Sequence, residues 1–215
     1  MKKSLLTIAA TTLLATSAFT SSSVLAVEGL SANVGVVSQY FFRGIVQTDT
    51  ASASAGIDYE NGNFSVGTWA ADVQDGIEVD IYGSYAFTLS ELDLSVGFTS
   101  YQYTGDFDTA YNEINLGASY SFVSVSYNLG THDVDGAADE DYDFLAVTAE
   151  YEGFYATYGT WGKDFDGDYV ELGYGTEVSG FDLGVALIVN SKELNLERET
   201  DEGDESLVFS LSKAF

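Results

Sequence analysis

After residue 26, apolar and polar residues alternate along almost the whole chain, and this alternation constrains the fold more than any other feature. In segment 77–89, for example, Ile77 and Val79 fall on one face, and Glu78 and Asp80 fall on the other. Successive side chains of a β-strand point to opposite faces, whereas an amphipathic helix repeats its apolar residues every three to four positions. The sequence therefore predicts an all-β protein.

Segments of this kind follow one another to the end of the chain. Most of them are close to the roughly 9–11 residues that a tilted strand needs to cross a bilayer. The predicted strands cover residues 31–43, 51–60, 63–72, 77–89, 92–103, 111–121, 123–130, 142–151, 154–162, 169–178, 181–190 and 206–215.

The connections between these segments alternate between short and long. The short ones are Asn61-Gly62, Ser90-Glu91, Ser121-Phe122, Glu152-Gly153 and Ser179-Gly180. The long ones are 44–50, 73–76, 104–110, 131–141, 163–168 and 191–205. Outer-membrane barrels have short periplasmic turns and longer external loops, whereas a β-sandwich has no reason to alternate. We therefore predict an antiparallel transmembrane β-barrel of about 12 strands in the bacterial outer membrane, with both termini periplasmic.

The first 26 residues have the layout of a secretory signal peptide. A positive start at Lys2 and Lys3 precedes an apolar run, and Val24 and Ala26 then supply the small side chains of a cleavage site. The apolar run is shorter than the roughly 18 residues of a membrane-spanning helix. We expect a signal helix in residues 1–26, cleaved after Ala26, and a single barrel domain in residues 27–215.

Charge and composition agree with this class. The chain carries 34 acidic and 7 basic residues, a formal net charge of −27, so nucleic acid is not an expected partner because its phosphates would be repelled. Cysteine and proline are absent, whereas the chain has 15 Tyr, 14 Phe and 22 Gly. A chain without proline suits continuous paired strands, and abundant aromatic residues and glycine fit a barrel.

Aromatic residues gather near the ends of the predicted strands. The last segment ends at Phe215, which shares a face with Leu207, Phe209 and Leu211. A terminal Phe on an alternating strand is the usual assembly signal of outer-membrane barrels, so the barrel-assembly machinery is an expected partner. An ordinary amphipathic edge strand is the alternative. The residues expected in an interfacial girdle are Tyr40, Tyr59, Tyr120, Tyr151, Phe154 and Phe181.

Several segments resemble the TorF-type porin family of proteobacteria. The strongest is Val37-Ser-Gln-Tyr-Phe-Phe-Arg-Gly-Ile45, and the segments 56–59, 67–69 and 78–83 follow it in the expected order. The resemblance covers the N-terminal half well and the remainder by pattern, and it implies an outer-membrane barrel of porin type. The chain departs from the family by lacking a proline in the third hairpin, which leaves the shape of loop 104–110 open.

The face opposite the apolar one should line the lumen. Its mid-strand side chains are mostly small, and because about eight strands are just filled by side chains, twelve such strands can leave an aqueous path. We expect passive diffusion of small solutes through this path. The predicted pore-lining residues are Arg43, Trp69, Glu78, Asp80, Tyr82, Glu113, Trp161 and Glu171. The alternative is a structural or surface-interaction barrel plugged by the inward aromatic residues Phe41, Trp69, Tyr82, Tyr101, Tyr103, Phe144, Tyr155 and Trp161.

Carboxylates should dominate the charge of the lumen. Rings of carboxylates favour cations, so we expect a preference for cationic solutes. Arg43 is the only basic residue well inside the predicted strands apart from Lys213. An unpaired buried charge is costly, so Arg43 should pair with Glu78, Asp80 or Glu113, and we interpret it as a structural partner rather than a substrate clamp.

The long loops are strongly acidic, as in segments 133–143 and 164–168. Such loops are expected to be solvated and to contact outer-membrane lipids and lipopolysaccharide, with divalent cations as bridges, and no dedicated metal site or cofactor is predicted. An enzyme is not expected. The one histidine, His132, lies in a predicted loop, and no serine can be paired with it from the sequence. A soluble carrier barrel is a further alternative, which the terminal Phe215 and the alternation of loop lengths disfavour.

Overall fold

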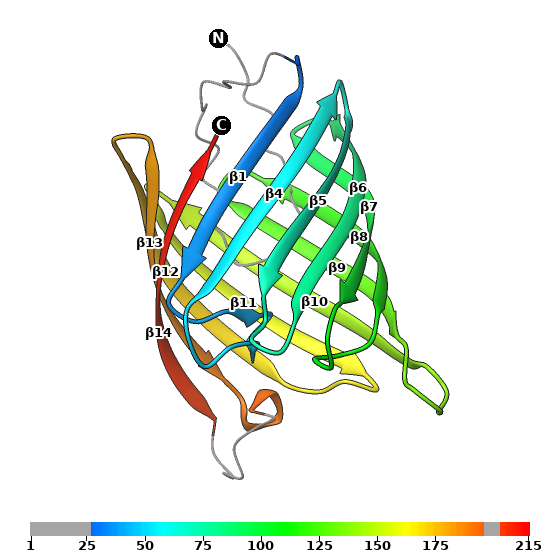
Figure 1. Cartoon of the computed structure of the whole chain (residues 1–215). Helices are drawn as coiled ribbons and strands as arrows, with labels where there is room; N and C mark the ends of the chain where they lie inside the picture. Colours follow the sequence, from blue (N-terminus) through cyan, green and yellow to red (C-terminus); the bar gives the residue numbers. More distant parts are fainter. Residues whose placement is uncertain (1–26, 196–202) are drawn as a thin grey trace.

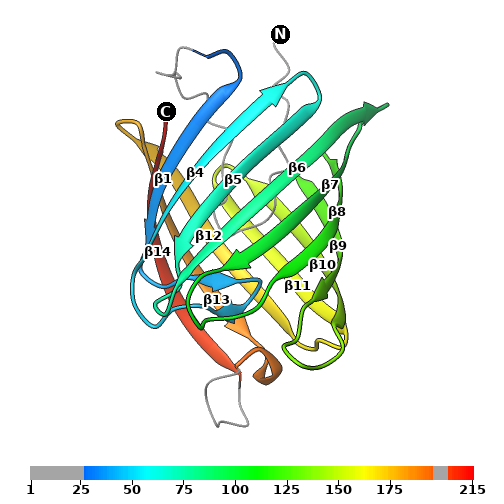
Figure 2. The same ribbon diagram turned by 45° about the vertical axis from the view of Figure 1, so that its right-hand side comes forward.

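The computed structural model describes residues 27–195 and 203–215, so the predicted signal peptide and part of the last loop lie outside the described residues. Its main feature is a closed antiparallel barrel of twelve strands (Figures 1 and 2). The barrel strands are β1 (Leu30–Val37), β4 (Ser52–Asn61), β5 (Phe64–Asp72), β6 (Ile77–Leu89), β7 (Leu92–Tyr103), β8 (Tyr111–Tyr120), β9 (Val123–His132), β10 (Glu140–Tyr151), β11 (Phe154–Lys163), β12 (Asp168–Val178), β13 (Phe181–Asn190) and β14 (Asp204–Ala214). The predicted fold class is confirmed.

Closure depends on the first and last strands of the barrel. β1 pairs with β4 on one side, from Leu30 opposite Tyr59 to Val37 opposite Ser52, and with β14 on the other. Every barrel strand is thus paired along both edges, which removes the open edge at which another chain could add a strand. The one helix of the described residues is a short 3₁₀ turn, Lys192–Leu194, and no helix there is long and apolar enough to cross a membrane.

Tight turns join strands at one end of the barrel, called here the turn end, and longer connections lie at the opposite loop end (Figure 1). Four of the five predicted turns lie where expected, and the first is shifted by one residue, to 62–63. Glu152 and Gly153 have φ values of 51° and 84°. Positive φ at both central residues matches the right-handed twist of a hairpin, and a glycine adopts it at little cost.

The two faces of the wall differ sharply in chemistry. Large apolar side chains point outward along every barrel strand, and many are about half exposed, as at Leu172 (51%) and Ile114 (51%). The inward side chains are mostly Gly, Ser, Thr, Tyr and carboxylates. Outward aromatic residues gather at the turn end, where Tyr59, Tyr120, Tyr151, Phe154 and Phe181 are exposed. The predicted outward apolar face is therefore present, and of the six residues predicted for the interfacial girdle only Tyr40 does not lie on it.

The predicted first strand, 31–43, is wrong in its second half. β1 ends at Val37, and residues 38–51, called here the inserted hairpin, fold into the loop half of the lumen, as the short blue arrows in Figures 1 and 2 show. The hairpin contains β2 (Phe41–Phe42) and β3 (Ile45–Val46), which pair with each other. Its turn is Arg43-Gly44, with φ values of 49° and 84°. The run of three aromatic residues, Tyr40, Phe41 and Phe42, does not alternate between a lipid face and a polar face, and Tyr40 and Phe41 are buried inside the barrel.

Candidate functional site

The inserted hairpin is held in the lumen mainly by side chains of the barrel wall. Trp161 Nε1 donates a hydrogen bond of 3.1 Å to the carbonyl oxygen of Arg43, and Asn190 Nδ2 donates one of 3.0 Å to that of Gly44. Gly44 fits tightly, because a Cβ there would lie 2.8 Å from both Leu194 and Tyr169 side-chain atoms. The hairpin is thus anchored at its turn, the point farthest from its two connections to the wall.

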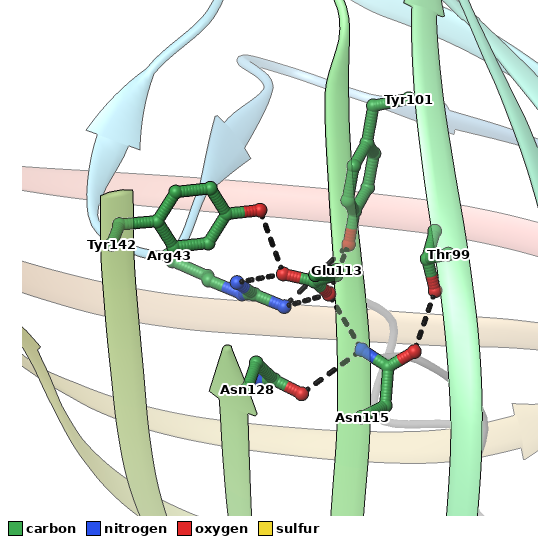
Figure 3. A network of polar contacts seen from close by, with 7 residues as sticks. All are labelled: Arg43, Thr99, Tyr101, Glu113, Asn115, Asn128 and Tyr142. Carbon is green, nitrogen blue, oxygen red and sulfur yellow. Dashed lines mark hydrogen bonds and ion pairs between the residues drawn. The ribbon is translucent and has the colours of Figure 1, made fainter. Parts of the chain in front are cut away.

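Glu113 of β8 is the centre of the polar network that receives this turn (Figure 3). Arg43 binds it with both terminal nitrogens, Nη2 to Oε1 at 2.7 Å and Nη1 to Oε2 at 2.9 Å. The Tyr101 and Tyr142 hydroxyls donate to the same carboxylate, at 2.8 and 3.0 Å. Asn115 Nδ2 adds a further hydrogen bond of 2.6 Å. Two-pronged pairing with a fully buried carboxylate is among the stronger polar contacts a protein makes.

Aromatic rings enclose the guanidinium of Arg43. Its central carbon lies 4.5 Å from the Phe144 ring centre, 4.8 Å from that of Phe42 and 5.5 Å from that of Trp161. Arg43 is 2% exposed, and Phe144 is fully buried. Desolvation strengthens both cation–π attraction and the ion pair, but it also makes an unpaired guanidinium costly. Of the three carboxylates expected as partners of Arg43, Glu113 is the one that it binds. Arg43 itself lies at a hairpin turn, and its predicted place in a barrel strand is wrong.

A second contact holds the start of the hairpin against β6. The Tyr40 hydroxyl donates to Glu78 Oε1 at 2.8 Å, and the Tyr40 ring packs edge-on against Trp69 at 5.8 Å. Tyr40 is 4% exposed, so its predicted place in the interfacial girdle is wrong. Alternation predicts an outward Tyr40 only for a continuous strand over residues 31–43, and β1 ends at Val37.

The predicted pore-lining residues all face the lumen but do not form one cluster. Arg43, Glu113 and Trp161 are in direct contact, and Trp69 and Glu78 contact the hairpin through Tyr40. The remaining three residues have other neighbours on the inner wall. Asp80 lies between Trp69 and Tyr101, its cross-strand neighbours, Tyr82 donates to Asp58, and Glu171 accepts from Tyr155.

Sequence reasoning missed several polar members of the network. Asn115 bridges Glu113 to Asn128 Oδ1 at 3.0 Å, and the Thr99 hydroxyl donates to Asn115 Oδ1 at 2.9 Å (Figure 3). All of them occupy inward positions of neighbouring strands β7, β8 and β9. The alternation of the sequence indicates that these residues point inward. It does not give the strand register, which brings them together.

Burial of the inward residues changes along the barrel axis. In the loop half, inward residues such as Tyr142, Trp161 and Ile188 are buried. In the turn half, the inward residues are half-buried, and many are small, although Tyr82, Tyr155 and Asp58 also lie there. This region is called here the vestibule. The vestibule is lined by Ser54, Ser84, Gly97, Gly117, Ser126, Gly173, Gly184 and Ser210. The lumen is therefore packed around the inserted hairpin and more accessible at its turn end.

His132 is the last residue of β9 rather than part of a loop. Its ring stacks on Tyr111 with ring centres 4.0 Å apart, and its nitrogens lie 3.1 Å from Asp108 and 3.4 Å from Glu140. The hydroxyl nearest to it belongs to Thr109, which also donates to the Asp133 carbonyl oxygen. No serine is hydrogen-bonded to His132 within the described residues. Nor does any group of three or more His, Cys, Asp or Glu side chains there have an arrangement suited to a metal ion.

The comparison with protein families finds a match that spans the whole barrel. The model of a family described as bacterial protein of unknown function (Gcw_chp) matches residues 21–215. The chain belongs to the Gcw_chp family. A comparison with curated proteins finds no match to this sequence. The family description assigns no activity, so the TorF-type resemblance remains a matter for the proposal below.

Solved structures add a likeness in fold. A chain from a study of the in-meso crystallization of membrane proteins is 12% identical, with a TM-score of 0.59, over 86% of this chain and 83% of that one. The outer membrane protein OpdK from Pseudomonas aeruginosa is 13% identical, with a TM-score of 0.45, over 88% of this chain and 67% of that one. A BenF-like porin from Pseudomonas fluorescens Pf-5 is 10% identical, with a TM-score of 0.44, over 88% and 65%. The first likeness supports the barrel fold, and the other two are too distant to carry an argument.

Proposed function

We propose that this Gcw_chp member is a porin-like outer-membrane barrel of TorF type, through which small solutes diffuse passively when the inserted hairpin moves aside. The observation that carries the proposal is the contrast between wall and hairpin. The wall is closed by continuous strand pairing, whereas the hairpin's strands pair only with each other among the described residues. Side-chain contacts can release without unfolding the barrel, so the hairpin is the element suited to gate the lumen.

The apolar exterior supports insertion in a membrane. Soluble proteins rarely expose contiguous apolar surface of more than a few hundred Å², whereas here every barrel strand presents large aliphatic residues outward. In the proposed orientation the turn end and both termini face the periplasm, and the acidic loops face outward toward lipopolysaccharide. Export through a signal peptide cleaved after Ala26, bridging of the loops by divalent cations and assembly through Phe215 belong to the same proposal.

Leu116→Arg tests which solvent the outer face meets. Leu116 is 41% exposed and lies outward at mid-strand in β8, opposite Val96 and Tyr127. Arg at the bilayer midplane costs about 2–4 kcal/mol in an outer-membrane barrel. We expect urea unfolding of the barrel in lipid vesicles to show a loss of this size. A soluble carrier barrel would tolerate the same substitution almost without loss, so an unchanged midpoint would contradict membrane insertion.

The inner wall supports a preference for cations. Four inward carboxylates are buried in the loop half, Glu78, Asp80, Glu113 and Glu171, against one buried guanidinium. Further carboxylates, such as Asp58 and Asp182, are half-buried toward the turn end. A path lined by this excess of negative charge attracts cations and repels anions.

A plugged surface-interaction barrel is the second candidate function. The observation that favours it is the complete burial of the Arg43–Glu113 pair among aromatic rings, which stabilises the hairpin inside the lumen. The two functions differ in whether the hairpin ever leaves its seat. A permanently seated hairpin would leave the acidic loops as the surface that meets partners.

Single-channel recording separates the two functions. Residues 27–215 are refolded into planar bilayers, and current is recorded with a salt gradient across the membrane. A gated porin gives discrete steps between a dominant closed level and an open level, with a reversal potential on the cation side. A folded barrel that never conducts, even under high voltage, supports the plugged alternative. Steps with an anion-side reversal potential would contradict the cation preference and leave the pore itself intact.

A further inference from the structure

Two neighbouring inward carboxylates of β6 are buried without a basic partner. Glu78 and Asp80 are 0% and 2% exposed. One oxygen of Glu78 accepts the hydrogen bond from Tyr40, and the Tyr103 side chain lies beside the same carboxylate, but Glu78 Oε2 and Asp80 Oδ1 are buried without a hydrogen bond of good geometry. Burying an ionised carboxylate costs free energy unless a positive charge neutralises it or hydrogen bonds compensate it. The two orphaned oxygens therefore need either a bound proton or a bound cation.

The described basic residues do not supply that charge. Arg43, the nearest, commits both terminal nitrogens to Glu113, and its Nε, although buried, makes no hydrogen bond to either carboxylate. Lys163 and Lys192 are exposed, and Lys213 lies over the rings of Phe181 and Phe215 at the turn end. His132 lies between two other carboxylates. The Arg43–Glu113 pair is neutral as a unit, so any net negative charge beside the hairpin is carried by Glu78 and Asp80.

Aromatic rings flank this pair of carboxylates on both sides. Trp69 and Tyr101 are the cross-strand neighbours of Asp80, and Tyr103 is a neighbour of Glu78. Aromatic faces attract cations, and carboxylate with hydroxyl oxygens are ligands for hard cations. Tyr82, the next inward residue of β6 toward the turn end, is half-buried, so the pair adjoins the accessible part of the lumen. Along β6, Tyr82 is one inward position from Asp80 and two inward positions from Glu78, so an ion in the vestibule reaches Asp80 first.

We propose that Glu78 and Asp80 bind a monovalent inorganic cation, with Glu78 Oε2 and Asp80 Oδ1 as its protein ligands. A divalent cation between two buried carboxylates would be held too tightly to leave, whereas a partly hydrated monovalent ion is held weakly enough to both enter and leave. The consequence for permeation rests on the proposed function, because this site would give an open pore its cation preference. The binding itself needs no open pore.

The two tryptophans of the chain provide the measurement. Trp161→Phe leaves Trp69, the neighbour of Asp80, as the only tryptophan. It keeps an aromatic ring beside Arg43 but removes the hydrogen bond to the Arg43 carbonyl oxygen, so every other variant is made in this background and compared with it. The refolded variant is titrated with thallous nitrate, because thallium(I) resembles potassium in charge and size and quenches indole fluorescence on contact. We expect saturable quenching that potassium nitrate competes away. Glu78→Gln/Asp80→Asn should raise the apparent Kd by about tenfold or more, since both charged ligands are lost.

A charge-matched variant separates site binding from general attraction. Glu91→Gln/Glu152→Gln removes two carboxylates from exposed tight turns and should leave the titration unchanged. Folding of each variant is checked by its heat-modifiable mobility on gels, and Asp80→Asn alone replaces the double variant if that does not fold. Linear quenching without saturation, or saturation that survives loss of both carboxylates, would overturn the proposal. Because no current is measured, a barrel that fails to conduct can still pass this test.

Discussion

Replacing residues 38–51 with Asn-Gly is expected to turn the barrel into a permanently open pore. Val37 of β1 and Ser52 of β4 are direct cross-strand partners, so a two-residue turn can join them without changing the register of the wall. The replacement removes Tyr40, Arg43 and the rest of the inserted hairpin from the lumen. The barrel keeps all of its strand pairs, because the hairpin strands β2 and β3 pair only with each other among the described residues.

The measurement is single-channel conductance in planar bilayers, compared with the unmodified chain. We expect the closed level to disappear and the open level to persist. A matched control replaces 133–139 with Asn-Gly between His132 and Glu140, which are also direct partners at the loop end. Residues 135–139 are exposed, so this control should gate like the unmodified chain. If the hairpin-free barrel folds and conducts no better than the control, the inserted hairpin is not the gate.

The wall of this barrel could be predicted from the sequence because its lipid face imposes a period of two on every strand. A single misplaced residue would turn an apolar side chain inward, so alternation fixes both the strand and its faces. Segment 77–89 is predicted with the bounds that β6 has. The tight turns follow as well, because Glu152-Gly153 and Ser179-Gly180 each supply a glycine, the residue that adopts positive φ at little cost.

The inserted hairpin escaped prediction because its interactions are not periodic. Tyr40, Phe41 and Phe42 break the alternation, and the positive φ of Arg43-Gly44 marks a turn, but both features were absorbed into an overlong first strand. The ion pair joins residues 70 positions apart, and Glu113 was one of three equally reasonable partners. The place of the hairpin turn in the lumen decides that Arg43 pairs with Glu113 and not with Glu78 or Asp80. Inward and outward placement is therefore local information, whereas the choice of partner is not.

Glu113→Gln is expected to release the inserted hairpin while the barrel stays folded. The substitution keeps the shape of the side chain but leaves the Arg43 guanidinium buried among Phe42, Phe144 and Trp161 without a counter-charge. Removing one partner of a buried ion pair costs about 3–5 kcal/mol. Moving the hairpin out of the lumen relieves this cost by returning Arg43 to water, and it breaks no strand pair of the wall.

If that cost acts on the closed state alone, the ratio of open to closed channels rises on the order of a hundredfold to a thousandfold, at about 1.4 kcal/mol for each factor of ten. The open fraction of single-channel records in planar bilayers measures it. Arg43→Met/Glu113→Gln is the informative companion, because Met fills the aromatic enclosure without a charge and a buried ion pair can often be replaced by apolar packing at little cost. We expect this double variant to close again. Glu91→Gln, in an exposed tight turn, controls for loss of a carboxylate outside the lumen. A Glu113→Gln barrel that remains as closed as the unmodified chain would mean that packing of the aromatic residues, and not the ion pair, seats the hairpin.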